Sequence, residues 1–243
     1  MRQQQVRALI EHVRKDLEKI KTEYETSLQS KTINLSLQID VKNLMENLRS
    51  TLDYIANDVY QRVVKPDRVA SGQKEIKDIY FPYGKDEKDF KSSVGRYLPK
   101  LEALSPHVFS IFERIQPHKC GNNWLFNFCN ILNRNKHDNL SPQTRVEKRG
   151  LKLDFAGGGG ITLGPGAIME GSGKIVSGSG VLELRGNTVS GDSPVEDLPQ
   201  TIKQTVIIWV GFRFADTEVD VLPLVQLASK EIEQLAKDIY STI

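Results

Sequence analysis

The sequence has little of what would assign a protein class at once. Its two cysteines, Cys120 and Cys129, are too few for a disulfide framework. No apolar run approaches the roughly 18 residues of a membrane span, and the N-terminal segment lacks the apolar core of a signal peptide. The formal net charge of +2 gives no bulk attraction to nucleic acid. We therefore expect a cytoplasmic, non-membrane protein whose nucleic-acid affinity, if any, depends on a local patch.

The known phosphate-binding glycine motifs are also missing, although glycine is frequent between residues 157 and 186. Gly173-Lys174 is followed by Ile175 instead of serine or threonine, so the P-loop pattern is absent. No Gly-x-Ser-x-Gly elbow supports a serine nucleophile. The glycines instead predict hairpin turns between short strands.

A metal site drawn from the histidines and cysteines meets a geometric obstacle. His118 and Cys120 form a chelating pair in sequence, with Cys129 and His137 as further ligands. Cys129 and His137, however, fall on one predicted helix, about 12 Å apart along its axis. That distance is too long for one zinc ion, and Cys129 lies on an apolar face, where a free thiol packs as a small hydrophobe. We expect no metal and no cofactor.

Helical periodicity is what the first 140 residues do contain. Apolar side chains recur at helical spacing in residues 2–28 and 37–64, and Pro66 is expected to end the second helix. Shorter helices are predicted at about 87–98, from Pro106 to about 116 with Ser105 as N-cap, and at 122–137. Between them, Ile79–Tyr83 is an apolar segment in a polar loop, extended at Phe81 because proline follows. Residues 1–140 are predicted to form an antiparallel helical bundle domain.

The pattern changes in residues 146–216, where period-two alternation and glycines replace the helical period. Residues 151–155, 181–185 and 205–214 are predicted strands of a small antiparallel β-meander, with Trp209 in its core. Residues 217–243 return to a helix whose long apolar stripe needs a partner, so it should pack back on the bundle. The fold class is therefore α+β, with the meander inserted before the C-terminal helix.

One predicted helix carries a line of asparagines that ends in cations. Helix C-termini favour Arg, Lys and His because these side chains complement the helix dipole. That preference does not explain the asparagines, which lower helix propensity. The face could bind a phosphate, a ribose or another polar helix; its members are Asn123, Asn127, Asn130, Asn133, Arg134, Lys136 and His137.

A second set of polar residues lies on the 37–64 helix. Arg49 and Asp53 are four residues apart, a spacing that gives a surface ion pair worth about 0.3–0.5 kcal/mol. They flank Leu48 and Leu52, so their face is also expected to be partly buried, where a charge needs a partner. Lys136 or His137 would be that partner.

These motifs resemble a family of uncharacterised bacterial proteins. That family has a helical Leu-Arg-x-x-Leu-Asp-His/Tyr motif, matched here by Leu48–Tyr54, and a later Lys-His motif, matched by Lys136-His137. More remotely, the helical part is similar to HEPN domains, which are α-helical bundles, often dimeric, of ribonucleases in toxin–antitoxin and phage-defence systems. Their usual motif is Arg-x4–6-His, whereas two residues separate Arg134 from His137.

The resemblance implies an RNA-binding or metal-independent ribonuclease module that forms a homodimer. His137 would act as general acid or base on a ribose 2′-hydroxyl. Arg134, Lys136 or Arg49 would stabilise the phosphorane, and Asp53 and Asn133 would position His137. Asn130 and Tyr54 are further binding candidates. In the alternative, the chain is a non-catalytic module that binds a partner protein, and Arg49, Asp53, Lys136 and His137 form a structural network between two helices.

Overall fold

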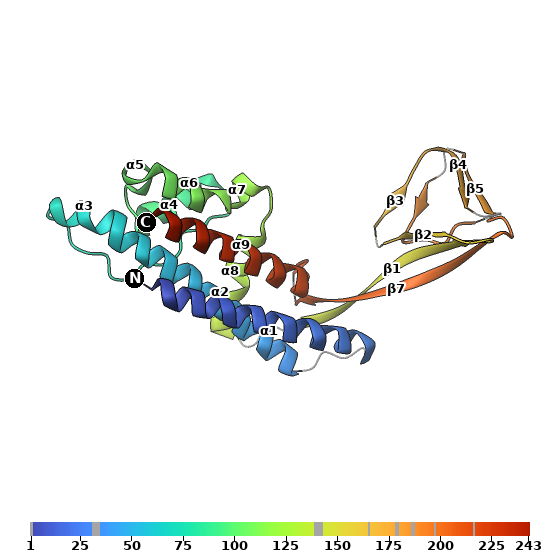
Figure 1. Cartoon of the computed structure of the whole chain (residues 1–243), viewed down its shortest axis with the longest axis horizontal. Helices are drawn as coiled ribbons and strands as arrows, with labels where there is room; N and C mark the ends of the chain where they lie inside the picture. Colours follow the sequence, from blue (N-terminus) through green and yellow to red (C-terminus); the bar gives the residue numbers. More distant parts are fainter. Residues whose placement is uncertain are drawn as a thin grey trace. The chain divides into compact units, whose positions relative to one another are not determined.

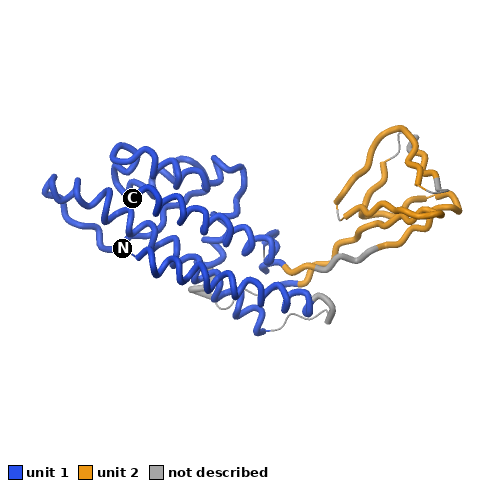
Figure 2. Tube along the Cα trace, in the orientation of Figure 1, with its two compact units in different colours: residues 1–144, 213–243 blue, residues 145–212 orange. Residues whose placement is uncertain are grey.

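The computed structural model of the chain describes residues 2–30, 35–138, 143–164, 166–177, 180–185, 188–196, 198–215 and 217–243. At 28–30, 134–138, 180, 184–185 and 207–210 it describes the backbone only. The chain divides into two compact units (Figure 2): residues 1–144 with 213–243 form a helical unit, and residues 145–212 form a strand unit.

Helices make up the first unit (Figure 1). In chain order they are α1 (Gln3–Ser30), α2 (Leu35–Val59), the π-helical turn η1 (Tyr60–Val64), α3 (Lys65–Ala70), α4 (Glu87–Tyr97), α5 (Leu101–Leu104), α6 (Pro106–Arg114), α7 (Pro117–Cys120), α8 (Trp124–Asp138) and α9 (Val221–Thr242). The long helices α1, α2 and α9 pack on one another, and α9 also contacts α6 and α8. The C-terminal helix therefore shares the core of the N-terminal helices.

The helical core follows from the apolar spacing. In α1 the fully or almost fully buried side chains Val6, Val13 and Ile20 are seven residues apart, which keeps them on one face. The predicted apolar stripe of α9 is buried along its length, including Val225 and Ile232. The predictions of long N-terminal helices and of a C-terminal helix are confirmed.

The prediction that Pro66 ends the second helix is wrong. The π-helical turn η1 directly follows α2, and α3 directly follows η1, so helical turns continue past Pro66 to Ala70. The Lys65 amide bonds to the Tyr60 carbonyl, five residues back. Pro66 then lies in the first turn of α3, where a missing N–H costs nothing.

The segment between α3 and α4 enters the core at Phe81, as its apolar character predicted. Phe81 is 1% exposed, and its ring centroid lies 4.9 Å from that of Phe112 on α6. Asp86 is the N-cap of the next helix, α4, and its carboxylate accepts a hydrogen bond from the Asp89 amide at 2.9 Å. Ser105 precedes α6 as expected, but its side chain makes no capping bond.

The strands are β1 (Gln143–Phe155), β2 (Gly160–Leu163), β3 (Ile168–Met169), β4 (Ser172–Ser177), β5 (Gly180–Arg185), β6 (Val189–Ser190) and β7 (Ile202–Phe214). They form three sheets with the strand orders β2-β1-β7, β3-β6 and β4-β5, and the pairs β1–β2, β3–β6 and β4–β5 are antiparallel. The predicted meander is therefore wrong in its connectivity, because β1 lies beside β7 and β3 pairs with β6. A small core joins them, formed by Leu151, Leu153, Phe155, Leu182, Val189 and Ile202.

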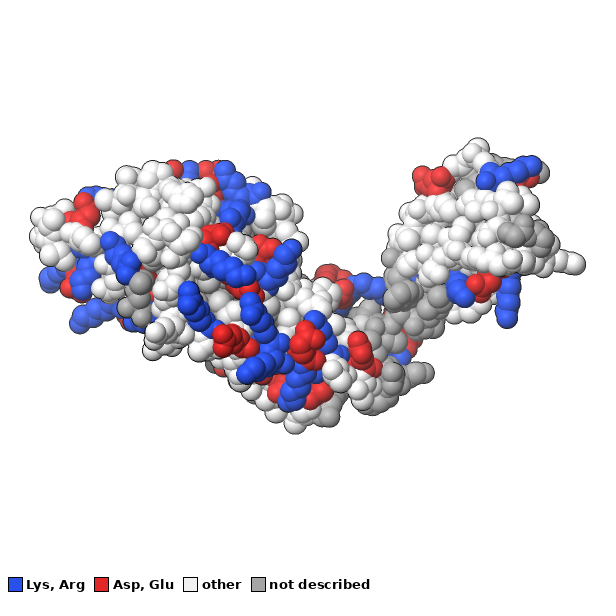
Figure 3. Space-filling model, in the orientation of Figure 1, with Lys and Arg blue, Asp and Glu red and all other residues white. Residues whose placement is uncertain are grey.

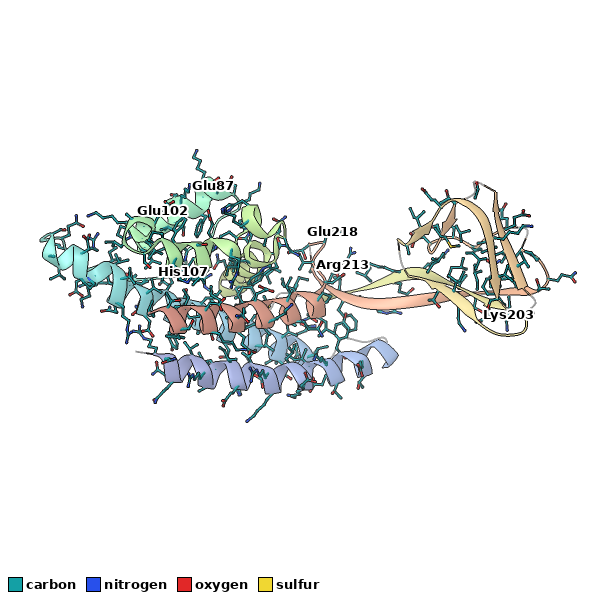
Figure 4. All side chains as sticks on the ribbon, turned by 45° about the horizontal axis from the view of Figure 1, so that its top comes forward. Glu87, Glu102, His107, Lys203, Arg213 and Glu218 are labelled. Atoms are coloured by element: carbon teal, nitrogen blue, oxygen red, sulfur yellow. The ribbon has the colours of Figure 1, made fainter. Side chains whose placement is uncertain are left out.

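The chain enters the strand unit along β1 and leaves it along β7. The unit covers residues 145–212, against the predicted 146–216. Figure 4 labels Arg213, near the end of β7, and Glu218 in the turn that follows, and these two side chains form an ion pair. Arg213 also donates to Asp220 at 3.0 Å, just before α9 begins. The side chain of Trp209 lies outside the described residues.

Candidate functional site

Arg49 of α2 holds its guanidinium against three neighbours. Its Nε donates to Asp53 Oδ2 at 3.3 Å, and its Nη1 donates to Cys129 Sγ on α8 at 2.8 Å. The guanidinium carbon also lies 5.3 Å from the ring centroid of Tyr83, within cation–π range. The side chain is 15% exposed. A charge among leucines is therefore compensated inside the protein.

Asp53 uses its two carboxylate oxygens for two different elements. Oδ2 accepts from Arg49, whereas Oδ1 accepts from the backbone amide of Phe81 at 2.8 Å. The second bond fixes the loop at the point where Phe81 enters the core. Asp53 therefore joins α2 to this loop, and Arg49 joins α2 to α8.

Two further side chains complete the connection between the loop and the helices. The Tyr83 hydroxyl accepts a hydrogen bond from Asn133 Nδ2 of α8 at 3.0 Å. Gln116 is fully buried, accepts from the Gly84 amide and donates to the Pro82 carbonyl, both at 3.3 Å. We call Arg49, Asp53, Tyr83, Cys129 and Asn133 the α2–α8 cluster.

Burial sets the electrostatics of this cluster. It raises the pKa of the Cys129 thiol to about 11, against the opposing pull of the Arg49 charge. Burial also raises the pKa of the Tyr83 hydroxyl. Both groups are neutral near pH 7, so neither serves as a nucleophile or an anionic base there. The charges of the cluster are Arg49 and Asp53, which lie against each other.

The fold brings together part of the predicted site. Arg49, Asp53 and Asn133 belong to one cluster, linked through Tyr83 and Cys129. Helix α8 continues through Arg134, Lys136 and His137, but the side chains of these three lie outside the described residues. Whether they contact Arg49 or Asp53 therefore stays a prediction, as does the catalytic role of every candidate.

Two other candidates stand apart in their contacts. Tyr54 has the guanidinium of Arg2 over its ring, with 5.7 Å from carbon to centroid. Asn130 is half-buried on α8, and its side chain has no hydrogen-bond partner among the described residues. Neither bonds to the cluster.

Sequence reasoning missed Cys129, Tyr83 and Gln116 as members or supports of the site. Cys129 was predicted only as a core residue, and it is fully buried. The sequence feature that could have indicated its place in the site is its position four residues, about one helical turn, before Asn133. Tyr83 and Gln116 gave no local signal, because their contacts join segments that are far apart in the chain.

His118 and Cys120, which were considered above as a chelating pair for a metal, contact other groups of the protein. His118 Nε2 lies 3.4 Å from Glu113 Oε1. The Cys120 thiol lies near two carbonyl oxygens, at 3.3 Å from that of Asn122 and 3.8 Å from that of Ile115. Among the residues with described side chains, no three potential metal ligands come together.

A second buried carboxylate lies elsewhere on α2. Asp58 is 4% exposed, and its Oδ2 accepts from the backbone amide of Arg2 at 2.8 Å and from the Tyr240 hydroxyl at 2.9 Å. One side chain thus connects the start of α1, the body of α2 and the end of α9. Its partners are all within the protein, which indicates a structural role.

Comparisons with known proteins give this site no precedent. No protein-family model matches the chain, and no curated protein or solved structure is significantly similar to it. Within the described residues, no helix is both long and apolar enough to cross a membrane.

Proposed function

We propose that the chain is a non-catalytic protein-interaction module in which the α2–α8 cluster has a structural role. The cluster holds α8 and the loop at Phe81 against α2, and we call this role the lock. The observation that supports this most directly is the use of Arg49. Its Nε, one terminal nitrogen and its ring-stacking face all contact the protein itself. An arginine that stabilises a transition state must instead direct its donors at the substrate. Asp53 likewise accepts from donors of the protein itself, among them Arg49 Nε and the Phe81 amide.

Exposed apolar side chains support the interaction part of the proposal. Several of them lie in the strand unit: Ile168, Val176, Val181 and Val206. Val176 and Val181 are direct partners across the β4–β5 pair, and Val176 is 65% exposed. This cross-strand pair of exposed valines offers a partner protein a small apolar contact.

Urea unfolding of Asp53→Asn and Arg49→Met tests the lock. Each change leaves a buried donor or charge without its partner, so each is expected to lower the free energy of unfolding by about 1–3 kcal/mol. The matched control is Glu87→Gln, which breaks an exposed i,i+4 pair with Lys91 and should cost less than about 0.5 kcal/mol. Wild-type stability in both cluster variants would disprove the lock.

The second candidate is a HEPN-like RNA-binding or ribonuclease module, acting as a homodimer in a bacterial toxin or phage-defence system. Asn133 is exposed, and α8 remains helical to Asp138, so His137 follows Asn133 by one turn. Arg134, Lys136 and His137 would contact the RNA, and Arg49 and Asp53 would support them from α2.

His137→Ala and Lys136→Ala separate the two candidates. An interaction module predicts unchanged RNA binding and no RNA cleavage in wild type or variants. The ribonuclease candidate predicts wild-type cleavage or growth arrest that His137→Ala abolishes without changing the unfolding curve. In that candidate Asp53→Asn should reduce cleavage by more than it reduces the folded fraction, because Asp53 supports His137 from α2.

A further inference from the structure

Three tyrosines lie close together on the surface beside the α2–α8 cluster. Tyr80 and Tyr83 belong to the loop before α4, and Tyr97 is the last residue of α4. The rings of Tyr80 and Tyr97 meet edge to face, with centroids 5.7 Å apart and planes at 79°. Burial raises the pKa of the Tyr83 hydroxyl most, and the Tyr97 hydroxyl is close enough to raise it further. We call these three residues the tyrosine face.

The α2–α8 cluster holds the tyrosine face in one arrangement. The Phe81 ring is buried and its amide is bonded to Asp53, so the neighbouring Tyr80 stays at the surface, where it is 46% exposed. Tyr83 is half-buried, and its hydroxyl accepts a hydrogen bond from Asn133. A surface that is already ordered loses little conformational entropy when a ligand binds to it.

The hydroxyl groups of the tyrosine face have unused hydrogen-bond donors. Within the described residues, the hydroxyls of Tyr80 and Tyr97 have no hydrogen-bond partner. The Tyr83 hydroxyl accepts from Asn133, and its own proton has no acceptor in that part of the chain. Each phenol can donate one hydrogen bond. The face therefore presents donors beside aromatic rings, and a matching ligand needs acceptors beside apolar groups.

A proline-rich segment has that combination of groups. In the polyproline II conformation the backbone makes no internal hydrogen bonds, so its carbonyl oxygens are free acceptors. Proline has no N–H, so such a segment brings few backbone donors that would need partners on this face. Its pyrrolidine rings are apolar, and such segments are recognised by aromatic side chains. At about 3.1 Å per residue, about two residues fit along the 5.7 Å between the rings of Tyr80 and Tyr97.

An RNA strand matches the tyrosine face less well, although bases also stack on tyrosines. The angle of 79° between the planes of Tyr80 and Tyr97 leaves no parallel rings between which a base could be sandwiched. Figure 3 shows blue and red side chains interspersed over the visible side of the helical unit, so no broad field of one sign covers that side. That side therefore lacks the continuous cationic track that follows a nucleic-acid backbone.

We propose that the tyrosine face binds a proline-rich segment of a partner protein in the polyproline II conformation. The rings of Tyr80 and Tyr97 pack against pyrrolidine rings, and the hydroxyls of the face donate to carbonyl oxygens of the segment. This inference rests on the interaction part of the proposed function, for which it names a class of partner. The α2–α8 cluster contributes by keeping Tyr83 and the loop at Phe81 in place.

Fluorescence anisotropy with the full chain tests the proposal. The probe is a fluorescein-labelled 12-residue peptide made of four Pro-Pro-Ser repeats. In the matched probe alanine replaces every proline, which removes the pyrrolidine rings and the polyproline II preference but keeps the length and the charge. We expect saturable binding of the proline peptide and at least tenfold weaker binding of the alanine peptide.

Three variants locate the contact. Tyr80→Ala removes an exposed ring and should weaken binding of the proline peptide at least tenfold. Tyr80→Phe keeps the ring and removes one donor, so its loss should be only about two- to fivefold. Leu35→Ala removes an exposed apolar side chain at the start of α2, roughly 27 Å along the helix axis from Asp53, and should leave the affinity within twofold. Circular dichroism confirms that each variant is folded.

Several results would overturn the proposal. These are no saturable binding of the proline peptide, equal affinity for the two peptides, or equal losses in Tyr80→Ala and Leu35→Ala. Labelled oligouridine that binds the chain and loses affinity in Tyr80→Ala would assign the tyrosine face to RNA and would also overturn it. None of these results changes the stability expected of the Asp53 and Arg49 variants, so the lock is judged separately. The exposed valines of the strand unit also remain independent support for an interaction module.

Discussion

Arg49 and Cys129 form an unusual pair, a guanidinium donating to a thiol that stays neutral. The fully buried thiol has a pKa of about 11, so it ionises only well above neutral pH. Cys120, by contrast, is exposed. Cys120 is therefore accessible to reagents from solvent, whereas Cys129 is buried and has very little reactive thiolate at neutral pH.

This difference predicts selective alkylation. With iodoacetamide at pH 8, Cys120 should be modified in minutes, whereas Cys129 should remain mostly unmodified until urea unfolds the chain. Peptide mass spectrometry over a time course measures both rates. Equal rates for the two cysteines in the folded protein would contradict the buried position of Cys129.

Gly84 shows a second residue-level constraint, imposed by backbone contact. A Cβ at position 84 would lie 2.2 Å from the Phe90 amide nitrogen and 2.7 Å from the Asp89 carbonyl carbon. The start of α4 would have to move, and the bond from the Gly84 amide to Gln116 would be strained. A Cβ at Gly95, in the body of α4, meets nothing within 4 Å.

The two glycines therefore predict opposite responses to alanine. Gly84→Ala should destabilise the fold by about 1–3 kcal/mol through overpacking. Gly95→Ala should stabilise it by roughly 0.5–1 kcal/mol, because alanine is the better helix former. Urea unfolding measures both values. A Gly84→Ala protein as stable as wild type would show that the loop adjusts freely.

At the scale of elements, the helical unit is held by carboxylates that each contact two or more segments. Asp53 joins α2 to the Phe81 loop, and Asp58 joins α2 to the ends of α1 and α9. Burial and the hydrogen bond to Asp58 raise the pKa of Tyr240 above its usual value near 10. The bond therefore requires the protonated phenol.

Tyr240→Phe should lower the free energy of unfolding by about 1 kcal/mol at pH 7. Because the pKa is raised in the folded state, this contribution is full below pH 10 and is lost as the pH rises above it. The difference between wild type and Tyr240→Phe should thus shrink as the pH rises above about 10. Unfolding curves across that range measure it, and a constant difference would contradict the assigned bond.

At the scale of the whole molecule, each unit has its own core. The helical unit contains the long buried stripes of α1, α2 and α9, whereas the strand unit has a smaller cluster around Leu153 and Phe155. A strand unit of this size buries a smaller fraction of its unfolded surface than the larger helical unit does, so most of the stability should reside in the helices.

Replacing residues 145–212 by a short Gly-Ser turn should therefore leave a folded helical unit. Thr144 and Arg213 belong to the neighbouring strands β1 and β7, so a short turn replaces the insertion. Far-ultraviolet circular dichroism should show a cooperative thermal transition within about 10 °C of wild type. Loss of cooperative unfolding would mean that the helices depend on the strand unit.

Most of the local structure of the helical unit can be predicted from the sequence alone. Apolar spacing predicted α1, α2, α8 and α9, and Phe81 was recognised as an apolar residue entering from a polar loop. Glycine and alternation predicted short strands. Such signals are readable because they depend on the spacing between near neighbours in one element.

The contacts between distant segments, in contrast, are seen only in the folded chain. Cys129 as the partner of Arg49, Tyr83 between Arg49 and Asn133, and β7 beside β1 each join residues distant in the chain. No local period encodes such contacts. The continuation of the helix past Pro66 was also decided by the fold, because the π-helical turn at Tyr60–Val64 places proline where its missing N–H has no cost.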